Sequence, residues 1–445
     1  MELRSYTLRK FFIPLMLILA ILLVYTPVKA MAGEKILKIG ILGPMRYIAG
    51  KHQYWGAQLS AEEINETGGV KVGKDNYKIE LIKKDSNELS SVVDAVNGME
   101  KLITRDKCRF ILGTFRSEAT LAQQEIMADN KVIFIGIGSA SPRMTMRVAK
   151  EYDRYKYYFR TQPVNAANQV ALTLQILHKT ADALRKALGI KTVKVALLFE
   201  KAAWTEPMIK IAKAKLPKMG MEVIGLWQPS PMATDVTAEL SGIKSAGAHM
   251  IFEITSGPVG AVLARQWGEL QIPAALSGIN VQALQKSQWD ATDGKCQYET
   301  MMGFHARAAI TDKTIPFYDK FLERFSQFPS FSSGNDAIYV LKNAIERAGT
   351  LDTDAVVSAM EKTDYQGTIG RIAFYPKGHK WQHDVIYGPG YVTGLGLQWI
   401  NGEHKVIWPD GKTYFGDERF AKIKYPGTVD YKIPPWVIEY WKNKK

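Results

Sequence analysis

Short apolar runs alternate with amphipathic stretches along the first half of the chain. The runs have the length of buried strands, and the stretches between them carry apolar residues at helical spacing, as in Val92, Val96 and Met99. The predicted order is strand 36–42, helix 53–65, strand 77–82, helix 91–103, strand 110–112, helix 118–128 and strand 132–137. Strands that alternate with helices predict a parallel sheet with helices on both faces.

The same alternation begins again after a long amphipathic stretch at 166–188, so we expect two α/β units in tandem that meet near residues 157–164. The second unit is predicted to hold strands 193–199, 221–227, 250–254 and 274–277, with helices near 208–219, 236–246 and 259–270. Beyond these we expect helices 315–325, 337–348 and 354–361 and a strand at 370–374. The stretch 388–445 is rich in Gly, Pro, Trp and Tyr and predicts strands and extended surface segments packed on the body.

The first 32 residues have the three-part pattern of a secretory signal. Basic residues within the first ten are followed by an apolar run at 11–24 and then by small residues around Ala30 and Ala32. The run is shorter than the roughly 20 residues that a membrane-spanning helix needs. We therefore expect cleavage near Ala30 or Ala32 and a mature protein outside the cytoplasm, with a membrane anchor as the alternative.

Composition narrows the class of protein. The 445 residues are 46% hydrophobic and 23% charged, which is typical of globular domains and excludes a disordered chain. A net charge of +14 leaves nucleic acid, anionic membranes and acidic ligands as partners. The predicted export, and the lack of basic clusters interleaved with aromatic residues, argue against nucleic acid. Cys108 and Cys296 can pair in an exported protein, and composition alone leaves their pairing open.

No arrangement of residues indicates an enzyme. The sequence has no Gly-x-Ser-x-Gly elbow, no His-Glu-x-x-His and no P-loop. His379 and His383 are four apart, but the preceding Pro376 and Gly378 favour a loop, so we interpret them as a surface pair and not as a metal site. We therefore expect no catalytic residues, no metal and no cofactor.

Four loops directly after predicted strands contain small, hydroxyl-bearing or aromatic residues. They are 113–118, 138–142, 200–205 and 255–258. Ligands of open parallel sheets bind just beyond the carboxyl ends of the strands. Small loops at helix starts allow backbone N–H groups to meet an anion. Taken singly, a Ser or Thr here is better explained as a helix cap, and a core residue is the alternative for Trp204. That all four loops fall at the same end of their strands favours ligand binding.

Over residues 36–399 the sequence resembles the periplasmic branched-chain-amino-acid-binding proteins, which are type I substrate-binding components of ABC importers. The resemblance rests on the order and spacing of five segments. They are Gly56–Gly69 with Glu62-Glu63-Ile64-Asn65, Gly138–Pro142, Phe159-Arg160-Thr161, Tyr339–Gly349, and Gly367–Phe374.

This resemblance implies the type I periplasmic binding protein fold, in which two Rossmann-like α/β lobes joined by a hinge close on a ligand. It also places Cys108 and Cys296 in separate strands, which implies two free buried thiols. The first lobe is expected to comprise 33–163 plus 282–390, and the second 164–281 plus 391–445 with a C-terminal extension. The implied partners are a small-molecule ligand and the membrane permease of an ABC importer, and we expect a monomer. An extracytoplasmic sensing domain for a signalling partner is the alternative, and an amide hydrolase is a weaker one.

The ligand contacts of the family carry over unevenly. Ser117 matches the serine that receives the ligand carboxylate. Ala140 stands where the family has threonine, so Ser139 or Ser141 must supply that hydroxyl. Trp204 aligns with an aromatic position of the family.

The acidic positions that hold the ligand's ammonium group are replaced by Pro258 and Asn165. The resemblance therefore implies a ligand with a carboxylate or amide and no free amine. Arg116 can pair with that anionic end or point to solvent. Glu200 and Glu253 remain as acids able to restore an ammonium site.

Overall fold

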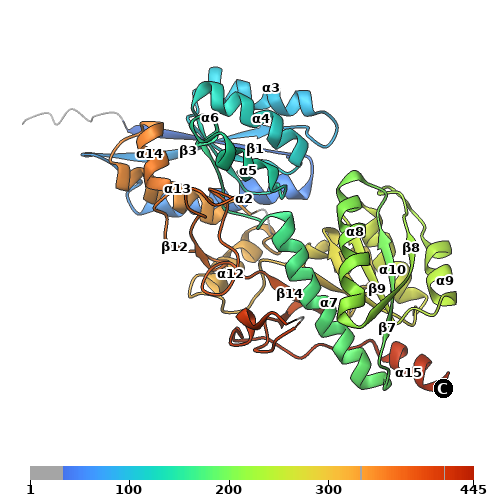
Figure 1. Cartoon of the computed structure of the whole chain (residues 1–445). Coiled ribbons are helices and arrows are strands. Elements are labelled where there is room, and N and C mark those ends of the chain that lie inside the picture. The colour runs from blue at the N-terminus through green and yellow to red at the C-terminus, as the bar shows by residue number, and fades with distance from the viewer. Residues whose placement is uncertain (1–33, 331–332, 415, 445) are drawn as a thin grey trace, which may run out of the picture. The chain divides into compact units, whose positions relative to one another are not determined.

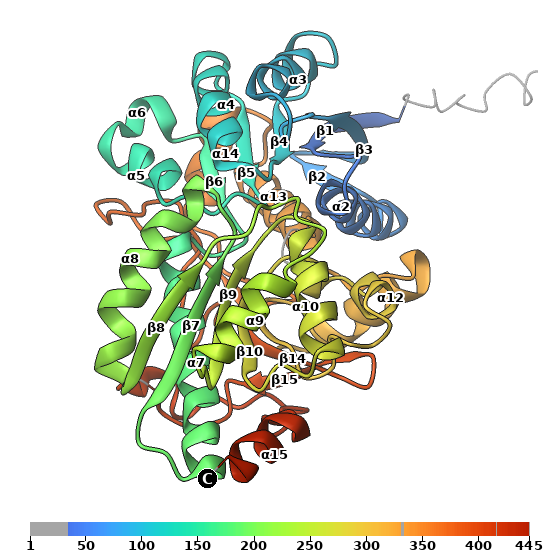
Figure 2. The ribbon, with the colours of Figure 1, turned by 90° about the vertical axis from the view of Figure 1, so that its right-hand side faces the viewer.

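The computed structural model describes residues 34–330, 333–414 and 416–444. The predicted signal segment 1–32 lies outside these residues. The strands form a six-stranded sheet, a seven-stranded sheet and a two-stranded sheet, with helices packed about the two large ones (Figures 1 and 2). The predicted α/β class is confirmed. Within the described ranges, no helix combines the length and apolar character required to cross a membrane.

The first large sheet is built from the chain before residue 161. Its order is β2 (Val70–Val72), β3 (Asp75–Asp85), β1 (Lys35–Gly43), β4 (Phe110–Gly113), β5 (Ile133–Gly136) and β6 (Tyr158–Arg160). From β1 to β6 the neighbouring strands run parallel. The connecting helices are α2 (Ile48–Glu66), α3 (Val92–Thr104), α4 (Ser117–Asn130), α5 (Arg143–Lys150) and α6 (Tyr152–Tyr155). The short β2, β6, α5 and α6 were not expected from the hydrophobic pattern.

The second large sheet begins after α7 (Ala166–Leu188), which has the predicted bounds. The sheet order is β15 (Glu403–Trp408), β14 (Leu395–Ile400), β11 (Thr300–Gly303), β10 (Ala275–Asn280), β9 (Met250–Thr255), β7 (Val193–Phe199) and β8 (Met221–Trp227). From β8 to β11 the neighbours are parallel, whereas β14 and β15 add an antiparallel hairpin. Its helices include α8 (Glu206–Lys215), α9 (Thr237–Ser245), α10 (Val259–Glu269) and α11 (Ser287–Ala291).

The segment 282–390 is divided between the two sheets, which differs from its predicted assignment to the first lobe. β11 pairs with β10 and β14, so residues 300–303 belong to the second sheet. The next helices are α12 (Thr314–Phe325), α13 (Asn335–Ala348) and α14 (Thr353–Met360). α12 and α13 pack against α2 of the first sheet. The remaining lobe boundaries stay a prediction.

The C-terminal region is more regular than predicted. Besides the buried strand β14, it ends in α15 (Pro435–Asn443). The indoles of Trp436 and Trp441 donate hydrogen bonds to the carbonyl oxygens of Ile272 and Pro273, at 3.0 and 2.6 Å. These bonds confirm that the aromatic residues of the tail pack it onto the body.

Alternating side chains of the second sheet enter two different cores. Val195 and Leu197 of β7 belong to a core shared with α7, whereas Leu198 packs with α9, α10 and the buried Trp267.

Cys108 and Cys296 are both buried and free. Burial raises the pKa of the Cys108 thiol to about 12, so the thiol is protonated and poorly reactive.

Candidate functional site

Each large sheet contains one strand at which the direction of winding reverses. β1 lies between β3 and β4, and β7 lies between β8 and β9. At such a point the successive connections leave toward opposite faces of the sheet, and a crevice opens beyond the carboxyl ends of the strands. The loops after β4, β7 and β9 carry Ser117, Trp204 and Pro258. These three residues therefore follow strands at the two positions where the fold favours a ligand, whereas the Ser139–Ser141 loop follows the neighbouring strand β5.

Close approach of the backbone shapes the reversal point of the first sheet. Gly113 ends β4 beside Leu42 of β1. A Cβ atom on Gly113 would lie 2.0 Å from the carbonyl oxygen of Leu42. Glycine at this position therefore allows β4 to end against β1 and the chain to turn toward Ser117.

Ser117 and the loop after β5 are in contact. Ser117 is the first residue of α4 and is half-buried. Its Oγ accepts a hydrogen bond from the backbone N–H of Ser141 at 3.3 Å. The two hydroxyl-rich loops that follow neighbouring strands are thus brought together, as their place in the sequence suggested.

Glu88 is a buried carboxylate at this site that sequence reasoning missed. Its Oε2 accepts hydrogen bonds from the backbone N–H groups of Phe115 at 3.0 Å and Arg116 at 2.7 Å, and its Oε1 accepts one from Ser86 Oγ at 2.8 Å. Burial raises the pKa of Glu88 to about 7, against the lowering effect of these hydrogen bonds. Two amide groups that we expected to face a ligand anion are therefore already bonded within the chain.

Arg116 is turned toward its own lobe. Its Nη1 donates to the carbonyl oxygens of Glu88 and Leu89 at 3.3 and 3.4 Å, and its Nε lies 3.4 Å from a carboxylate oxygen of Glu118. The expected pairing of this guanidinium with a ligand anion would require it to leave these contacts. Arg116 instead ties the start of α4 to the loop before α3.

The three residues of the loop after β5 differ in access to solvent. Ser139 is fully buried, and its Oγ hydrogen-bonds to Thr120 Oγ1. Ala140 and Ser141 are half-buried, and Ser141 Oγ accepts from the N–H of Arg143 at 3.3 Å as a local cap. Of the two serines proposed to replace the family threonine, Ser141 is therefore the accessible one.

Asn165 is a helix cap and does not face solvent. It is fully buried, and its Oδ1 accepts a hydrogen bond from the N–H of Asn168 at 3.1 Å at the start of α7. Its Nδ2 donates to Asp384 Oδ2 at 2.9 Å. Asn165 is thus engaged in capping α7 and in holding Asp384, and its place in a ligand site stays a prediction.

Glu200 organises the candidate loops of the second sheet. Its Oε1 accepts hydrogen bonds from Trp204 Nε1 at 2.8 Å and Ser256 Oγ at 2.6 Å. Its Oε2 accepts from the backbone N–H groups of Ser256 and Gly257 at 2.8 and 2.9 Å. A carboxylate offers about four acceptor positions, so all are in use. Glu200 therefore fixes Trp204 next to the loop after β9 and is not a free partner for an ammonium group.

Trp204 and Pro258 are the exposed members of that surface. The indole of Trp204 retains 37% of its accessible area, which excludes the alternative of a core residue. Pro258 is exposed at the start of α10 and has no side-chain group that binds a charge. Both positions are open to solvent and apolar.

Glu253 points into the core and not toward the loops. It is fully buried, and its pKa is raised by burial and by the charge of Glu299, which is also fully buried. Asn280 Nδ2 donates to Glu299 Oε1 at 2.6 Å. With Glu200 saturated and Glu253 enclosed, neither acid proposed from the sequence can restore an ammonium site without rearrangement.

Tyr47 is a further candidate that sequence reasoning missed. It lies in the loop after β1, directly before α2, and half of its surface is exposed. Exposure of a large aromatic side chain beside a reversal point marks a surface that can cover a planar or apolar ligand. The signal available in the sequence was Gly43-Pro44, which ends the strand ahead of this loop.

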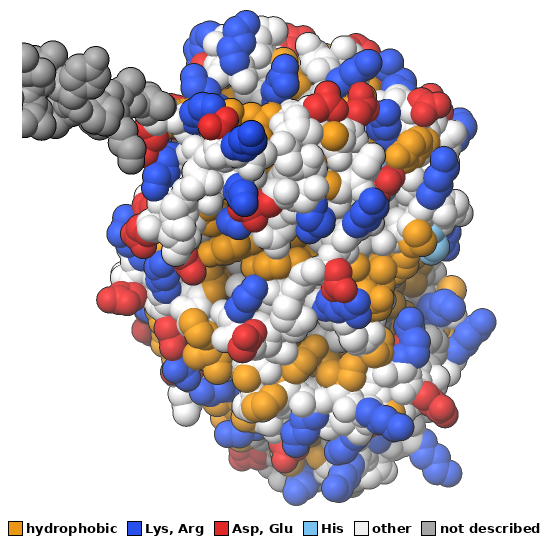
Figure 3. All heavy atoms as spheres, turned by 90° about the vertical axis from the view of Figure 1, so that its left-hand side faces the viewer, with side chains coloured by type: hydrophobic (Ala, Val, Ile, Leu, Met, Phe, Trp, Pro, Cys, Tyr) orange, Lys and Arg blue, Asp and Glu red, His pale blue; other side chains and the backbone are white. Residues whose placement is uncertain are grey.

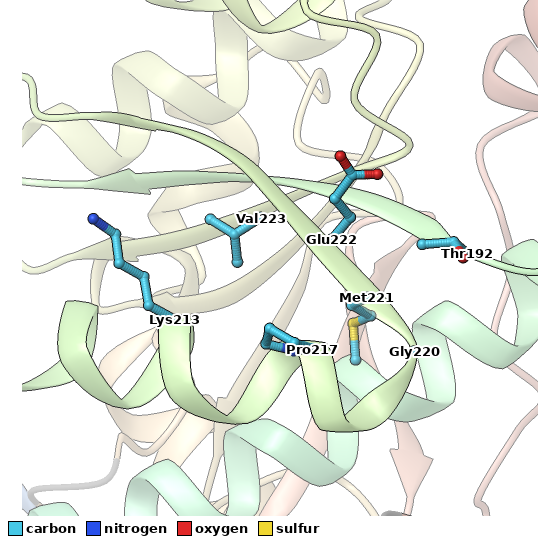
Figure 4. Close-up of a pocket in the computed structure, with 7 residues that line it drawn as sticks. All are labelled: Thr192, Lys213, Pro217, Gly220, Met221, Glu222 and Val223. Atoms are coloured by element: carbon cyan, nitrogen blue, oxygen red, sulfur yellow. The ribbon is translucent and has the colours of Figure 1, made fainter.

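Other features of the structure do not point to a second site. The part of the chain that is described contains no group of three or more His, Cys, Asp or Glu side chains able to hold a metal ion. His383 is buried, contrary to the expected surface pair, because it stacks on Phe159 with ring centroids 4.0 Å apart. A surface pocket of about 520 Å³ lies at the amino ends of β7 and β8, between Thr192, Lys213 and Glu222 (Figure 4). It is at the opposite edge of the sheet from Trp204.

Comparison with known proteins agrees with this architecture. The family model described as periplasmic binding protein matches residues 37–388. An amino acid binding protein of Pseudomonas aeruginosa is 26% identical over 239 residues, which cover 53% of this chain and 58% of that protein. A leucine-, isoleucine-, valine-, threonine- and alanine-binding protein of the same organism is 25% identical over 357 residues, covering 78% of this chain and 88% of that protein.

A solved structure shares the fold. It is a solute binding protein of an ABC transporter from R. palustris in complex with benzoate, with a TM-score of 0.66 at 17% identity. The match covers 84% of this chain and 95% of that one. It supports the type I two-lobe architecture, and the family model covers most of the chain. The chain belongs to the periplasmic binding protein family.

Proposed function

We propose that this chain is the extracytoplasmic solute-binding component of an ABC importer. The observation that supports the proposal is that each large sheet has a candidate loop after a strand at its reversal point, where open parallel sheets favour a ligand. In this proposal Ser117 and Ser141 contribute from the first sheet, and Trp204 with the Pro258 loop contributes from the second. Closure of the two lobes about the ligand produces the form that the membrane permease recognises.

The proposed ligand is a small carboxylic acid or amide without a free amine. Supporting this class, Pro258 and Asn165 occupy the acidic positions that the resemblance implies, and the carboxylate of Glu200 is saturated by donors of the loops after β7 and β9. An ammonium group that loses its hydration without a partner costs about 1–3 kcal/mol or more. At about 1.4 kcal/mol per factor of ten, that lowers affinity by one to two decades. Exposed Tyr47 and Trp204 suit a ligand with an apolar or planar part.

Export and processing belong to the same proposal. The family is one of periplasmic proteins, and we place cleavage near Ala30 or Ala32. N-terminal sequencing of the natively expressed protein tests this placement. Recovery of membrane-bound protein that retains Met1 would show that the first segment is an anchor.

Calorimetry tests the proposed ligand class. The purified protein is titrated with leucine, with 4-methyl-2-oxopentanoate as the matched analogue without an amine, and with benzoate. We expect the analogue or benzoate to bind at least tenfold more tightly than leucine. Micromolar binding of leucine with no heat from the other two would contradict the ligand class but retain a solute-binding function. Absence of any ligand in a wider thermal-shift screen would contradict the function itself, because a tight ligand raises the melting temperature by mass action.

A further inference from the structure

A fully buried ion pair lies behind the loop after β5. Arg160 is the last residue of β6, and neither it nor Asp384 has any exposed side-chain surface. Arg160 Nε donates to Asp384 Oδ1 at 2.8 Å, and Nη2 donates to Oδ2. The remaining nitrogen, Nη1, donates to the carbonyl oxygens of Ser139 and Ser141 at 3.2 and 2.9 Å. One guanidinium therefore connects Asp384 to two carbonyls of a candidate binding loop.

The hydrogen bonds from Arg160 orient the neighbouring N–H group of the loop as well as the two carbonyl groups. In a trans peptide the C=O and N–H groups point in opposite directions. Anchoring the carbonyl of Ser139 therefore also sets the direction of the Ala140 N–H. The N–H of Ser141 donates to Ser117 Oγ, so the loop is fixed from both sides.

Asp384 also holds the start of α7. Besides Arg160, its carboxylate accepts hydrogen bonds from Thr145 Oγ1 at 3.3 Å and from Asn165 Nδ2 at 2.9 Å. Asn165 caps α7, and the N–H of Ala166 donates to the carbonyl oxygen of Ala140 at 2.8 Å. Since α7 carries the chain from the first sheet to the second, this carboxylate joins the binding loop to the connection between the two sheets.

The segment that supplies Asp384 is itself firmly attached. The N–H of Arg160 donates to the carbonyl oxygen of His383 at 3.0 Å. The ring of His383 lies 3.1 Å from the carbonyl oxygen of Tyr158 through Nδ1 and 2.9 Å from Glu361 Oε1 through Nε2. These contacts fix the position of the Asp384 carboxylate, although Asp384 is distant from Arg160 in the sequence.

We propose that Arg160 and Asp384 are positioning residues for ligand binding, which hold the Ser139–Ser141 loop in its binding geometry and couple it to the start of α7. The inference rests on the proposed function. A fully buried guanidinium needs an acceptor for each of its donors, and here two of those acceptors are carbonyl oxygens of the candidate loop. Lysine cannot replace arginine here, because its single ammonium group lacks the planar fork that reaches a carboxylate and two carbonyls together.

The test compares Arg160→Lys and Asp384→Asn with a matched control. Lys179→Met removes another nearly buried ion pair, between Lys179 and Asp410, which makes no contact with the loop. Hydrogen exchange of the peptide spanning 138–145 reports on the loop without any ligand, and calorimetry with leucine and benzoate reports on binding. We expect Arg160→Lys and Asp384→Asn each to speed hydrogen exchange in 138–145 at least tenfold. Each should also raise the Kd of the probe ligand that binds at least tenfold. The control is expected to lower Tm and change neither quantity.

The possible results distinguish a positioning role of the ion pair from a purely stabilising one. If Arg160→Lys and Asp384→Asn lower Tm as the control does but keep the wild-type hydrogen exchange and Kd, the positioning role is overturned. The ion pair would then only stabilise the fold. If wild-type protein binds neither probe, the proposed ligand class has failed, and the exchange comparison alone decides whether the pair positions the loop. If Asp384→Asn does not fold, Thr145→Val removes one donor from the same carboxylate. It is then expected to speed exchange in 138–145 by a smaller factor, and unchanged exchange would contradict the inference.

Discussion

Glu88 should make the stability of the protein fall as the pH rises, and Glu88→Gln should remove that dependence. Burial raises the pKa of this carboxyl from 4.5 to about 7 in the folded state. Well below pH 4.5 the Glu88 carboxyl is protonated in both the folded and the unfolded state, so it does not lower the free energy of unfolding. As the pH rises, the unfolded chain releases the proton first, and the folded state is penalised by a free energy that is complete above pH 7.

The magnitude follows from the two pKa values. Each tenfold difference in proton affinity corresponds to about 1.4 kcal/mol, so the full penalty is about 3 kcal/mol. Between pH 5 and pH 8 about 2–3 kcal/mol of it develops. Glutamine keeps the shape and retains an oxygen for the N–H groups of Phe115 and Arg116. The variant should therefore gain about 2–3 kcal/mol relative to wild type over this range.

Urea unfolding at pH 5 and pH 8, extrapolated linearly to zero denaturant, measures this difference. Glu118→Gln is the matched control, because Glu118 stands at the start of the same helix with 59% of its side chain exposed. The control should follow the wild-type pH dependence. If Glu88→Gln and wild type lose stability in parallel between the two pH values, the assigned burial of a protonated Glu88 is wrong.

Three further predictions concern the sheets and their loops. Trp204→Ala should weaken ligand binding about two- to tenfold by calorimetry with little change in Tm, because Trp204 is 37% exposed and its loss removes an aromatic contact of about 0.5–1.5 kcal/mol. Unchanged affinity would remove Trp204 from the site. Glu253→Gln or Glu299→Gln should stabilise the protein more at pH 8 than at pH 5 in urea unfolding, because burial raises the pKa of both carboxyls; an equal effect at both pH values would contradict this. Gly113→Ala should cost about 1–3 kcal/mol of unfolding free energy through its clash with the Leu42 carbonyl oxygen, and wild-type stability would show that the strand end has room.

The regular elements with local signals were predictable from the sequence. α7 has the predicted bounds because its cap residue Asn165 and the glycine after its end, Gly189, both stand in the sequence. α15 was missed because it is a short helix held by tertiary contacts of its tryptophans. β11 was also missed, since a four-residue strand has little pattern of its own and forms by pairing with β10.

The candidate site was predictable only where it depends on strand ends. The contact of Ser117 with Ser141 follows from two loops at neighbouring carboxyl ends. The roles of Glu88 and Asp384 could not be predicted, because each acts on residues that are distant in the sequence and shows no local motif. The contacts of Arg116 could not be predicted for the same reason, since its partners belong to another loop, and its pairing with a ligand stays a prediction.

The distribution of charge adds little to the account of the site. On the face drawn in Figure 3 the Lys and Arg side chains are dispersed among Asp, Glu and apolar side chains. The net charge of +14 therefore forms no single basic stripe on that face. We therefore expect the specific loops of the candidate site, and not the overall positive charge of the surface, to determine anion binding.

A crystal structure of the complex with the tightest ligand from the calorimetric panel would show whether the two sheets share one ligand site. We expect one ligand molecule in contact with both Ser117 and Trp204, with its acidic or amide end toward the Ser139–Ser141 loop. A ligand bound elsewhere, for example in the pocket beside Lys213 and Glu222, or one that contacts a single sheet in a closed molecule, would contradict this expectation.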